Sequence, residues 1–299
     1  MNELAPIVIF AFNRLDTLKN TVSSLLQNKE AQDSDLFVFV DGARDGKPGE
    51  ADKVKSVQEY VQSITGFKNV RFTFSEENKG LGKSVIQGVT AVIDQYKKAI
   101  VLEDDLVFAS NFLAFMNEGL TRYEKEERVF SICGYSNQVK KPQDYSYDAY
   151  FCTRSSSWGW ATWADRWDSV DWELKDWDKY SKMKKEFNRW GGSDCFQMLR
   201  YVKESNKNLW AIRFCFSQFL QNKLSLFPTT SKVRNDGFDG SGTNCKRWSR
   251  FKYEFDNTQK TGFKLPDSVT LNKSLFHSAM SYNSIGIRIW SRIMYLIYN

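Results

Sequence analysis

The segment VLEDDLVF at 101–108 constrains the fold of this chain more than any other. Residues 99–102 are apolar without alternation, as in a strand buried on both faces of a parallel sheet. Three carboxylates follow at once: Glu103, Asp104 and Asp105. Adjacent acids at the end of a buried strand are unfavourable unless a positive group lies beside them. Mg²⁺ or Mn²⁺ fits, because both prefer oxygen ligands; a solvated acidic loop is the alternative.

The chain before this segment alternates apolar strands with amphipathic helices. Strands are predicted within 6–14, 36–46 and the start of 70–94, with helices at 16–28, capped by Asp16, and at the end of 70–94. This order indicates a mostly parallel α/β sheet. The carboxyl ends of parallel strands share one edge, so we expect the polar residues after each strand to meet there. These are Asn13, Arg14, Asp41, residues 78–83 and the three acids.

The turn Gly80-Leu81-Gly82-Lys83-Ser84 has the spacing of neither a P-loop nor a dinucleotide fingerprint. Two interpretations stay open. It is either a tight turn into a helix, or a turn whose backbone amides and Lys83 approach a nucleotide.

In this order, these segments resemble the nucleotide-sugar half of a GT-A glycosyltransferase, close to family 2 and to the N-acetylglucosaminyltransferase I type. Further segments, SSSWGWATWADRW at 155–167 and NDGFDGSGTN at 235–244, resemble bacterial family 2-like transferases, many from surface-polysaccharide clusters. The resemblance covers about residues 5–245. It implies a Rossmann-like sheet flanked by helices, with residues 1–108 binding the donor and 109–265 forming an acceptor lobe.

The resemblance also implies an activity and roles for single residues. The activity is metal-dependent, inverting transfer of a hexosyl or N-acetylhexosaminyl group from a UDP-sugar to a glycan. Asp41 would accept a hydrogen bond from uracil, Arg14 would face the diphosphate, and Asn13 would be a further nucleotide-binding residue. Asp105 would ligate Mn²⁺ or Mg²⁺, with Asp104 on the ribose or on metal-bound water. A metal ion and an arginine suit this chemistry because the leaving diphosphate gains negative charge.

The catalytic base is predicted at Asp194, in GGSDCFQMLRYV at 191–202. An acid at a helix start resembles the position of the base in the related enzymes, although Ser193 stands where they have a second acid. A helix N-cap is the alternative. Asp236 and Asp239 are alternative bases or late metal contacts.

Six tryptophans fall within residues 158–177. Indole rings stack on the apolar faces of sugars, and they also fill protein cores. We assign Trp158 and Trp160 to the wall of the acceptor site, because Ser155–Ser157 and Gly159 form a loop that permits close approach.

Composition restricts the remaining possibilities. A single histidine argues against a histidine-based triad, and five scattered cysteines are typical of free thiols in a reducing cytoplasm. The N-terminus shows no signal-peptide pattern, and no stretch of 18 uncharged apolar residues occurs. We therefore expect a cytoplasmic protein. No recognised nucleic-acid motif accompanies its basic residues.

The formal charge of +6 lies entirely within 246–299, which holds nine Lys and Arg against three acids. The last stretch, 284–299, places isoleucines on one helical face and Arg288 and Arg292 on another. This basic amphipathic tail, 266–299, either lies on the anionic inner face of a membrane, with a lipid-linked glycan as acceptor, or packs on the core.

Two other classes of protein compete with the glycosyltransferase interpretation. A nucleotidyltransferase acting on sugar phosphates would also carry carboxylates and a Gly-rich turn, but its phosphate loop would follow the first strand directly, where Asn13 and Arg14 lie. A non-catalytic sugar-binding module would use tryptophans but would not need three acids at a strand end.

Overall fold

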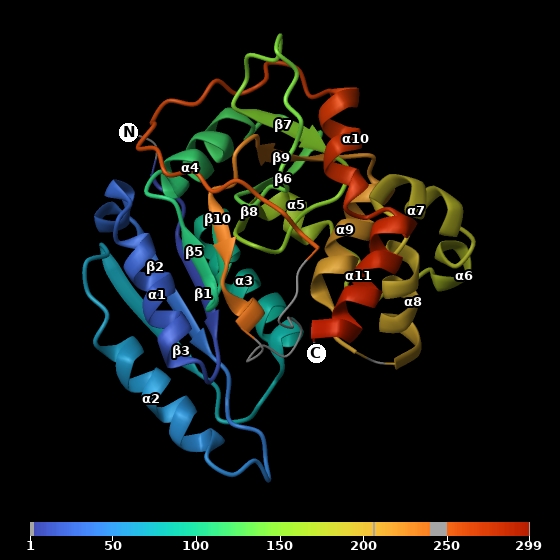
Figure 1. Cartoon of the computed structure of the whole chain (residues 1–299). Helices are drawn as coiled ribbons and strands as arrows, with labels where there is room; N and C mark the ends of the chain where they lie inside the picture. The colour runs from blue at the N-terminus through green and yellow to red at the C-terminus, as the bar shows by residue number, and fades with distance from the viewer. Residues whose placement is uncertain (1–2, 206, 240–249, 299) are drawn as a thin grey trace.

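The computed structural model describes residues 3–205, 207–239 and 250–298. Its centre is an eight-stranded sheet of order β3-β2-β1-β4-β8-β6-β9-β7 (Figure 1). Six strands share one direction, while β8 and β7 run against their neighbours. The predicted mostly parallel α/β sheet is therefore confirmed. The strands are β1 (Ile7–Ala11), β2 (Asp35–Val40), β3 (Asn69–Phe74), β4 (Lys98–Glu103), β6 (Val129–Cys133), β7 (Ala149–Cys152), β8 (Trp160–Trp163) and β9 (Leu224–Pro228).

Helices cover both faces of this sheet because adjacent strand residues point to opposite sides. One core layer packs Ile7 and Ile9 against α1 (Leu15–Leu25), α2 (Glu50–Gln62) and α4 (Phe112–Arg122). The other packs Val8 and Phe10 against α3 (Leu81–Tyr96), α5 (Ala164–Asp168) and α9 (Trp210–Leu220). A helical group beside the sheet joins α6 (Trp177–Tyr180), α7 (Lys184–Gly191) and α8 (Cys195–Ser205) to α9.

Two segments complete the described chain. β5 (Leu106–Phe108) pairs antiparallel with β10 (Val233–Asn235), which leads into the 3₁₀ turn η2 (Gly237–Asp239); another 3₁₀ turn, η1 (Lys29–Asp33), precedes β2. Toward the C-terminus, α10 (Lys273–Ser281) packs on β7 and is followed by α11 (Ile285–Tyr298). None of the helices in the described ranges is both long and apolar enough to cross a bilayer.

One local expectation is corrected. Asp16 lies in the first turn of α1 and does not cap it: the N-cap residue is Arg14, and no side chain makes the cap hydrogen bond. Arg14 occupies this position because its guanidinium is turned toward the acids after β4. After the acids, residues 106–108 form the separate short strand β5, which pairs with β10.

Trp160 does not line a site, which corrects the expectation from the sequence. Its side chain is 1% exposed and stacks on Trp167 and Trp210, with Phe214 at 5.0 Å between ring centroids. Gly159 has φ of +65°, so the chain turns sharply between Trp158 and Trp160. Only Trp160 therefore enters the core.

Trp160→Ala should lower the free energy of unfolding by about 3–5 kcal/mol, because it removes a fully buried indole from a stacked aromatic cluster. Tyr201→Ala, at a 46% exposed position on α8, is the matched control and should cost less than about 0.5 kcal/mol. Urea denaturation measures both. Equal losses in the two variants would contradict the core assignment.

Candidate functional site

An arginine lies between two acids where β1 and β4 end side by side. Arg14 Nη2 donates to Asp104 and lies 3.0 Å from Asp105 Oδ2, and the Phe12 backbone N–H donates weakly to Asp104 Oδ2 at 3.4 Å. Both carboxylates are buried. We call this group, with Glu103, the acidic edge. It forms because β1 and β4 are parallel neighbours, which brings residues about 90 apart in the sequence to one point.

Two buried atoms of the acidic edge have no hydrogen-bond partner within the described residues: Asp105 Oδ1 and Arg14 Nη1. Buried polar atoms are normally paired, so an orphan acceptor beside an orphan donor suggests two missing partners of opposite charge. A divalent cation suits the carboxylate oxygen, and a phosphate suits the guanidinium. Across the described ranges, no three His, Cys, Asp or Glu side chains converge to hold a metal ion, so the acidic edge is no closed protein cage.

Electrostatics at the acidic edge favour a bound cation. Burial raises the pKa of Glu103 to about 8, and the charges of Asp105 and Asp104 add to this effect. Burial also raises the pKa of Asp104 to about 6, although Arg14 opposes the rise. The pKa of Arg14 is raised because the two aspartates outweigh its burial. One guanidinium therefore faces two buried aspartates, which leaves an excess of negative charge when both are ionised.

The turn after β10 covers the acidic edge. The Asp236 backbone N–H donates to the Asp105 carbonyl at 2.9 Å. A Cβ on Gly237 would clash with Asp105 Oδ2, so a larger residue here would displace the Asp105 carboxylate. The Asp236 carboxylate pairs with Arg234 at 2.6 Å. The side chain of Asp239 and residues 240–244 of the Gly-rich loop lie outside the described residues.

Asp41 organises the turn at the start of α3. Its Oδ1 accepts from the Lys79 N–H and its Oδ2 from the Gly80 N–H, each at 2.8 Å. The Gly42 N–H also donates to Oδ1 at 3.1 Å, so Oδ2 is the oxygen that keeps a lone pair for a further hydrogen bond. Lys83 is exposed on the first turn of α3, and Ser84 Oγ is buried without a partner within the described residues.

Asn13 belongs to a network that the sequence did not reveal. Its Nδ2 donates to Glu50 Oε1 at 3.2 Å, and Glu50 also accepts from the Arg44 backbone N–H at 2.8 Å. Hydrogen bonds from the Arg44 side chain lower the pKa of Glu50 to about 2. No motif marked these residues, because Glu50 reads in the sequence as an ordinary acid in the first turn of a helix.

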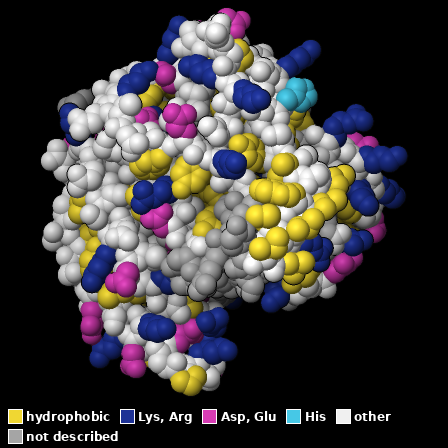
Figure 2. Space-filling model, in the orientation of Figure 1, with side chains coloured by type: hydrophobic (Ala, Val, Ile, Leu, Met, Phe, Trp, Pro, Cys, Tyr) yellow, Lys and Arg dark blue, Asp and Glu magenta, His cyan; other side chains and the backbone are white. Residues whose placement is uncertain are grey.

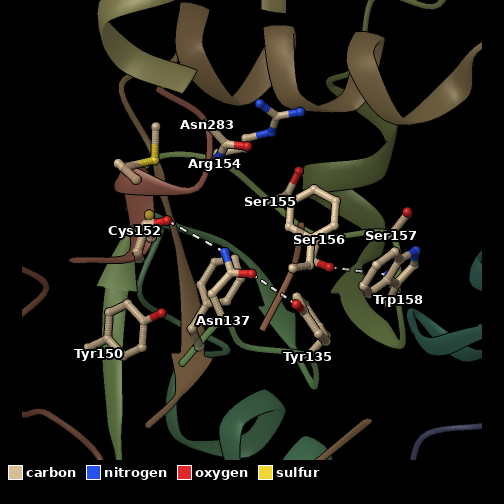
Figure 3. Close-up of a pocket in the computed structure, with 14 residues that line it drawn as sticks. Tyr135, Asn137, Tyr150, Cys152, Arg154, Ser155, Ser156, Ser157, Trp158 and Asn283 are labelled. Carbon is tan, nitrogen blue, oxygen red and sulfur yellow. Dashed lines mark hydrogen bonds between the residues drawn. The ribbon is translucent and has the colours of Figure 1, made fainter. Parts of the chain in front are cut away.

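A cavity of about 230 Å³ lies between the β6–β9–β7 end of the sheet and α10 (Figure 3). We call it the aromatic cavity. Trp158 and Tyr135 stand at one side, with ring centroids 4.6 Å apart. Polar groups for hydrogen bonding come from Asn137, Arg154 and Asn283. The other lining residues are Tyr150, Cys152, Ser155, Ser156, Ser157, Phe227, Phe251, Ala279 and Met280.

Asp194 lies beside this cavity and is held by one of its lining residues. Arg154 donates Nη1 to Asp194 Oδ1 at 2.8 Å and Nη2 to Oδ2 at 3.2 Å, a bidentate pair. The carboxylate therefore faces Arg154 at the start of α8. Burial alone would raise the pKa of Asp194, but the charge and hydrogen bonds of Arg154 lower it below its usual value.

The acidic edge and the aromatic cavity are joined through η2. Gly237 lies on Asp105, and the next residue, Phe238, packs edge-on against Trp158 at 5.7 Å between ring centroids. The structure therefore brings Arg14, the three acids and Asp236 together at one end of this path. Trp158 and Arg154, with Asp194, lie at the other. Nothing in the sequence marked Tyr135, Arg154 or Asn283 as neighbours of these residues.

The raised pKa of Glu103 predicts a pH effect on stability without divalent cations. From pH 6 to 8 the folded protein keeps a proton on Glu103 that the unfolded chain, with its pKa near 4.5, has lost. The free energy of unfolding should therefore fall as pH rises through this range. Glu103→Gln should flatten the decline, while exposed Glu127→Gln should not. Urea titrations in chelator-containing buffer measure this, and an unchanged slope in Glu103→Gln would contradict the assignment.

Comparisons with known proteins concern the family and the fold of this chain. Residues 7–204 match the glycosyl transferase family 2 model. Among solved structures, the chain is similar to GalNAc-T7 with UDP, GalNAc and Mn²⁺, at 14% identity and a TM-score of 0.50, over 81% of this chain and 46% of that one. A further match is the mannosyltransferase PcManGT from Pyrobaculum calidifontis in complex with GDP-Man and Mn²⁺. It has 11% identity and a TM-score of 0.36, over 55% of this chain and 46% of that one.

TarS of S. aureus also matches, at 10% identity and a TM-score of 0.42, over 77% of this chain and 36% of that one. This chain thus spans less than half the length of each of these three solved chains. The expected GT-A fold is confirmed. Because the family match covers about two thirds of its residues, the chain belongs to glycosyl transferase family 2.

Proposed function

We propose that this protein transfers a hexosyl or N-acetylhexosaminyl group from a UDP-sugar to a glycan acceptor, with a divalent cation and inversion at the anomeric carbon. The observation that carries the proposal is the pair of orphan atoms, Asp105 Oδ1 and Arg14 Nη1, at the carboxyl end of β4. This is where open α/β sheets bind their ligands. A nucleoside diphosphate with Mn²⁺ or Mg²⁺ would satisfy both atoms.

The residues present fit such a cation. Asp105 would hold it through Oδ1, and the diphosphate would supply further oxygens, as is usual for Mg²⁺. When bound, the cation neutralises charge on the leaving diphosphate. Arg14 Nη1 would donate to a phosphate oxygen while Nη2 keeps Asp104 in place. Arg14 is pre-positioned, so little reorganisation is needed as charge develops.

The remaining donor contacts come from the half that contains residues 1–108. Asp41 would accept a hydrogen bond from the uracil ring through Oδ2, which accepts only the Gly80 N–H within the described residues. Asn13 and Asp104 would face the diphosphate and ribose. Lys83, exposed on the first turn of α3, would reach the nucleotide from the other side of the turn.

Asp194 would act as the base in the acceptor half, residues 109–265. Its lowered pKa keeps it ionised at neutral pH, and Arg154 fixes both oxygens beside the aromatic cavity. Trp158 would stack on the acceptor sugar. A single displacement assisted by one carboxylate inverts the anomeric centre. Asp236, paired with Arg234 above Asp105, and Asp239 are the alternative bases.

Asp105→Asn should reduce metal-dependent sugar transfer to background while leaving the fold intact, because the orphan carboxylate oxygen loses its charge. Release of UDP from a UDP-sugar with Mn²⁺ measures the effect. Asp33→Asn, an exposed aspartate in η1, is the control and should retain full activity. Normal turnover by a folded Asp105→Asn protein would contradict the proposal that Asp105 binds the metal ion.

Asp194→Asn should slow transfer by about 100-fold or more, the usual scale for loss of a general base. Affinity for UDP should stay unchanged, because Asp194 lies at the cavity and not at the acidic edge. Single-turnover kinetics and UDP titration separate the two effects. Normal turnover in this variant would move the base to Asp236 or Asp239, which the corresponding Asn variants would then test.

We further propose that the protein works at the cytoplasmic face of a bacterial membrane, extending a lipid-linked glycan for a surface polysaccharide. Arg288 of α11 donates to Ser193 Oγ at 2.9 Å, so the first turn of this helix docks on the protein. Apolar side chains of α11 nevertheless remain exposed, including Ile289 at 58% and Leu296 at 75%, and form a patch (Figure 2). An exposed apolar helix face beside Arg292 suits an anionic lipid surface.

Ile289→Glu with Ile293→Glu should shift the protein from liposomes to the soluble fraction in flotation with anionic lipid. The charges oppose burial of the helix face and repel the lipid headgroups. Binding by the natural chain should weaken with salt and require anionic lipid. Tyr201→Glu, exposed on α8, controls for added charge. Equal soluble recovery of all three proteins with anionic liposomes would contradict membrane binding.

A further inference from the structure

Three arginines lie around the end of the aromatic cavity nearest α11, and one of them, Arg154, contacts the carboxylate of Asp194. Arg154 forms the bidentate pair with Asp194 and lines the cavity beside Asn283 (Figure 3). Arg288 donates to Ser193 Oγ at 2.9 Å, and Ser193 Oγ in turn donates to the Asn283 carbonyl at 3.1 Å. Asn283 is therefore tied to Arg288 through a single hydroxyl group.

Arg250 approaches the same wall from a different segment. Its Nε donates to the Tyr282 carbonyl at 3.1 Å, one residue before Asn283. Its guanidinium lies 4.4 Å from the ring centroid of Phe251, which lines the cavity. Arg250 and Arg288 stand behind the cavity wall: they contact Phe251 and residues 282–283, which include two of the residues that line the cavity.

The charges in this group do not balance. Asp194 satisfies Arg154, and within the described residues no carboxylate lies at ion-pair distance from Arg250 or Arg288. Burial lowers the pKa of Arg250, Asp194 opposes the shift, and the positive charges of Arg154 and Arg288 strengthen it. Among the described residues, three guanidinium groups therefore share one carboxylate, a net positive charge that an anion would stabilise.

The cavity itself is built for a sugar. Trp158 and Tyr135 offer aromatic faces, and Asn137 and Asn283 offer amide groups that can bond hydroxyls. Its volume of about 230 Å³ lies below the range of drug-sized ligand pockets, which suits a single sugar residue. Phe238 belongs to the turn that contacts Asp105, and it packs against Trp158, which lines the cavity.

We infer that the aromatic cavity binds an acceptor sugar carrying a negatively charged group, with Arg250 and Arg288 recognising the charge and Trp158 stacking on the ring. The role of the bound sugar as an acceptor rests on the proposed function. The presence of a site for an anionic sugar does not. The charged group is a carboxylate, as in a uronic acid, or a phosphate, as in a sugar phosphate. Guanidinium groups recognise both through paired hydrogen bonds.

The test measures binding of four probes by NMR titration: methyl glucuronide, glucose 6-phosphate, methyl glucoside and inorganic phosphate. At least one anionic sugar should bind about tenfold or more tightly than methyl glucoside, the scale of one hydrogen bond to a charged group. The anionic sugar that binds more tightly shows whether the site recognises a carboxylate or a phosphate. Equal binding of the neutral and anionic sugars would overturn the inference. Phosphate binding as tightly as glucose 6-phosphate would show an ion site without sugar recognition, which would also overturn it.

Substitutions test whether Arg250 and Arg288 cause the preference for the anionic sugar. Arg250→Gln and Arg288→Gln should each remove most of the preference for the anionic sugar while leaving methyl glucoside binding unchanged. Arg250→Lys and Arg288→Lys should keep part of it, and they test the same charges if a glutamine variant misfolds. Arg189→Gln, an exposed arginine on α7, is the matched control and should behave like the natural chain. Folded glutamine variants that keep the preference would refute the role of these arginines.

Titration of UDP with Mn²⁺ on the same samples separates this inference from the proposed function. Intact UDP binding with no anionic preference would remove the inference alone. An anionic preference without any Mn²⁺-dependent UDP binding would remove the proposed donor chemistry and leave the sugar site standing.

Discussion

An ion pair between Arg14 and the carboxylates of Asp104 and Asp105 joins the ends of two neighbouring strands. Without a positive group, acids buried together at a strand end would repel one another and take up protons. Arg14 opposes this only in part, because burial, together with the charge of Asp105, still raises the pKa of Asp104. The same pair leaves one oxygen and one nitrogen without partners. The interaction thus stabilises the edge of the sheet and also leaves it ready for a cation and an anion.

The second half of the molecule is arranged around this edge through backbone contacts. The β5–β10 ribbon delivers Gly237 onto Asp105, where a side chain would not fit, and carries Phe238 to Trp158. Beyond Trp158 the aromatic cavity opens, walled by segments as distant as β6 and α10. The geometry therefore places a candidate acceptor pocket beside a candidate donor edge, with η2 as the link between them.

The sequence predicted the sheet and the acidic edge because their signals are local. Uninterrupted apolar runs define buried strands, and acids directly after one of them are conspicuous. Asp194 was found as an acid at a helix start, but its partner Arg154 lies 40 residues earlier and no spacing connects the two. Trp158 and Trp160 looked equivalent by composition. They separate because Gly159, at a positive φ, turns the chain between the loop and β8.

The most direct test of the central claim is calorimetric titration of UDP into the protein with and without Mn²⁺. If Asp105 Oδ1 and Arg14 Nη1 await a cation and a diphosphate, UDP should bind at one saturable site when Mn²⁺ is present and much more weakly in chelator. Arg14→Gln should weaken the metal-dependent binding. UDP binding with equal affinity in the presence and absence of Mn²⁺, or no binding to the folded protein in either, would contradict the account.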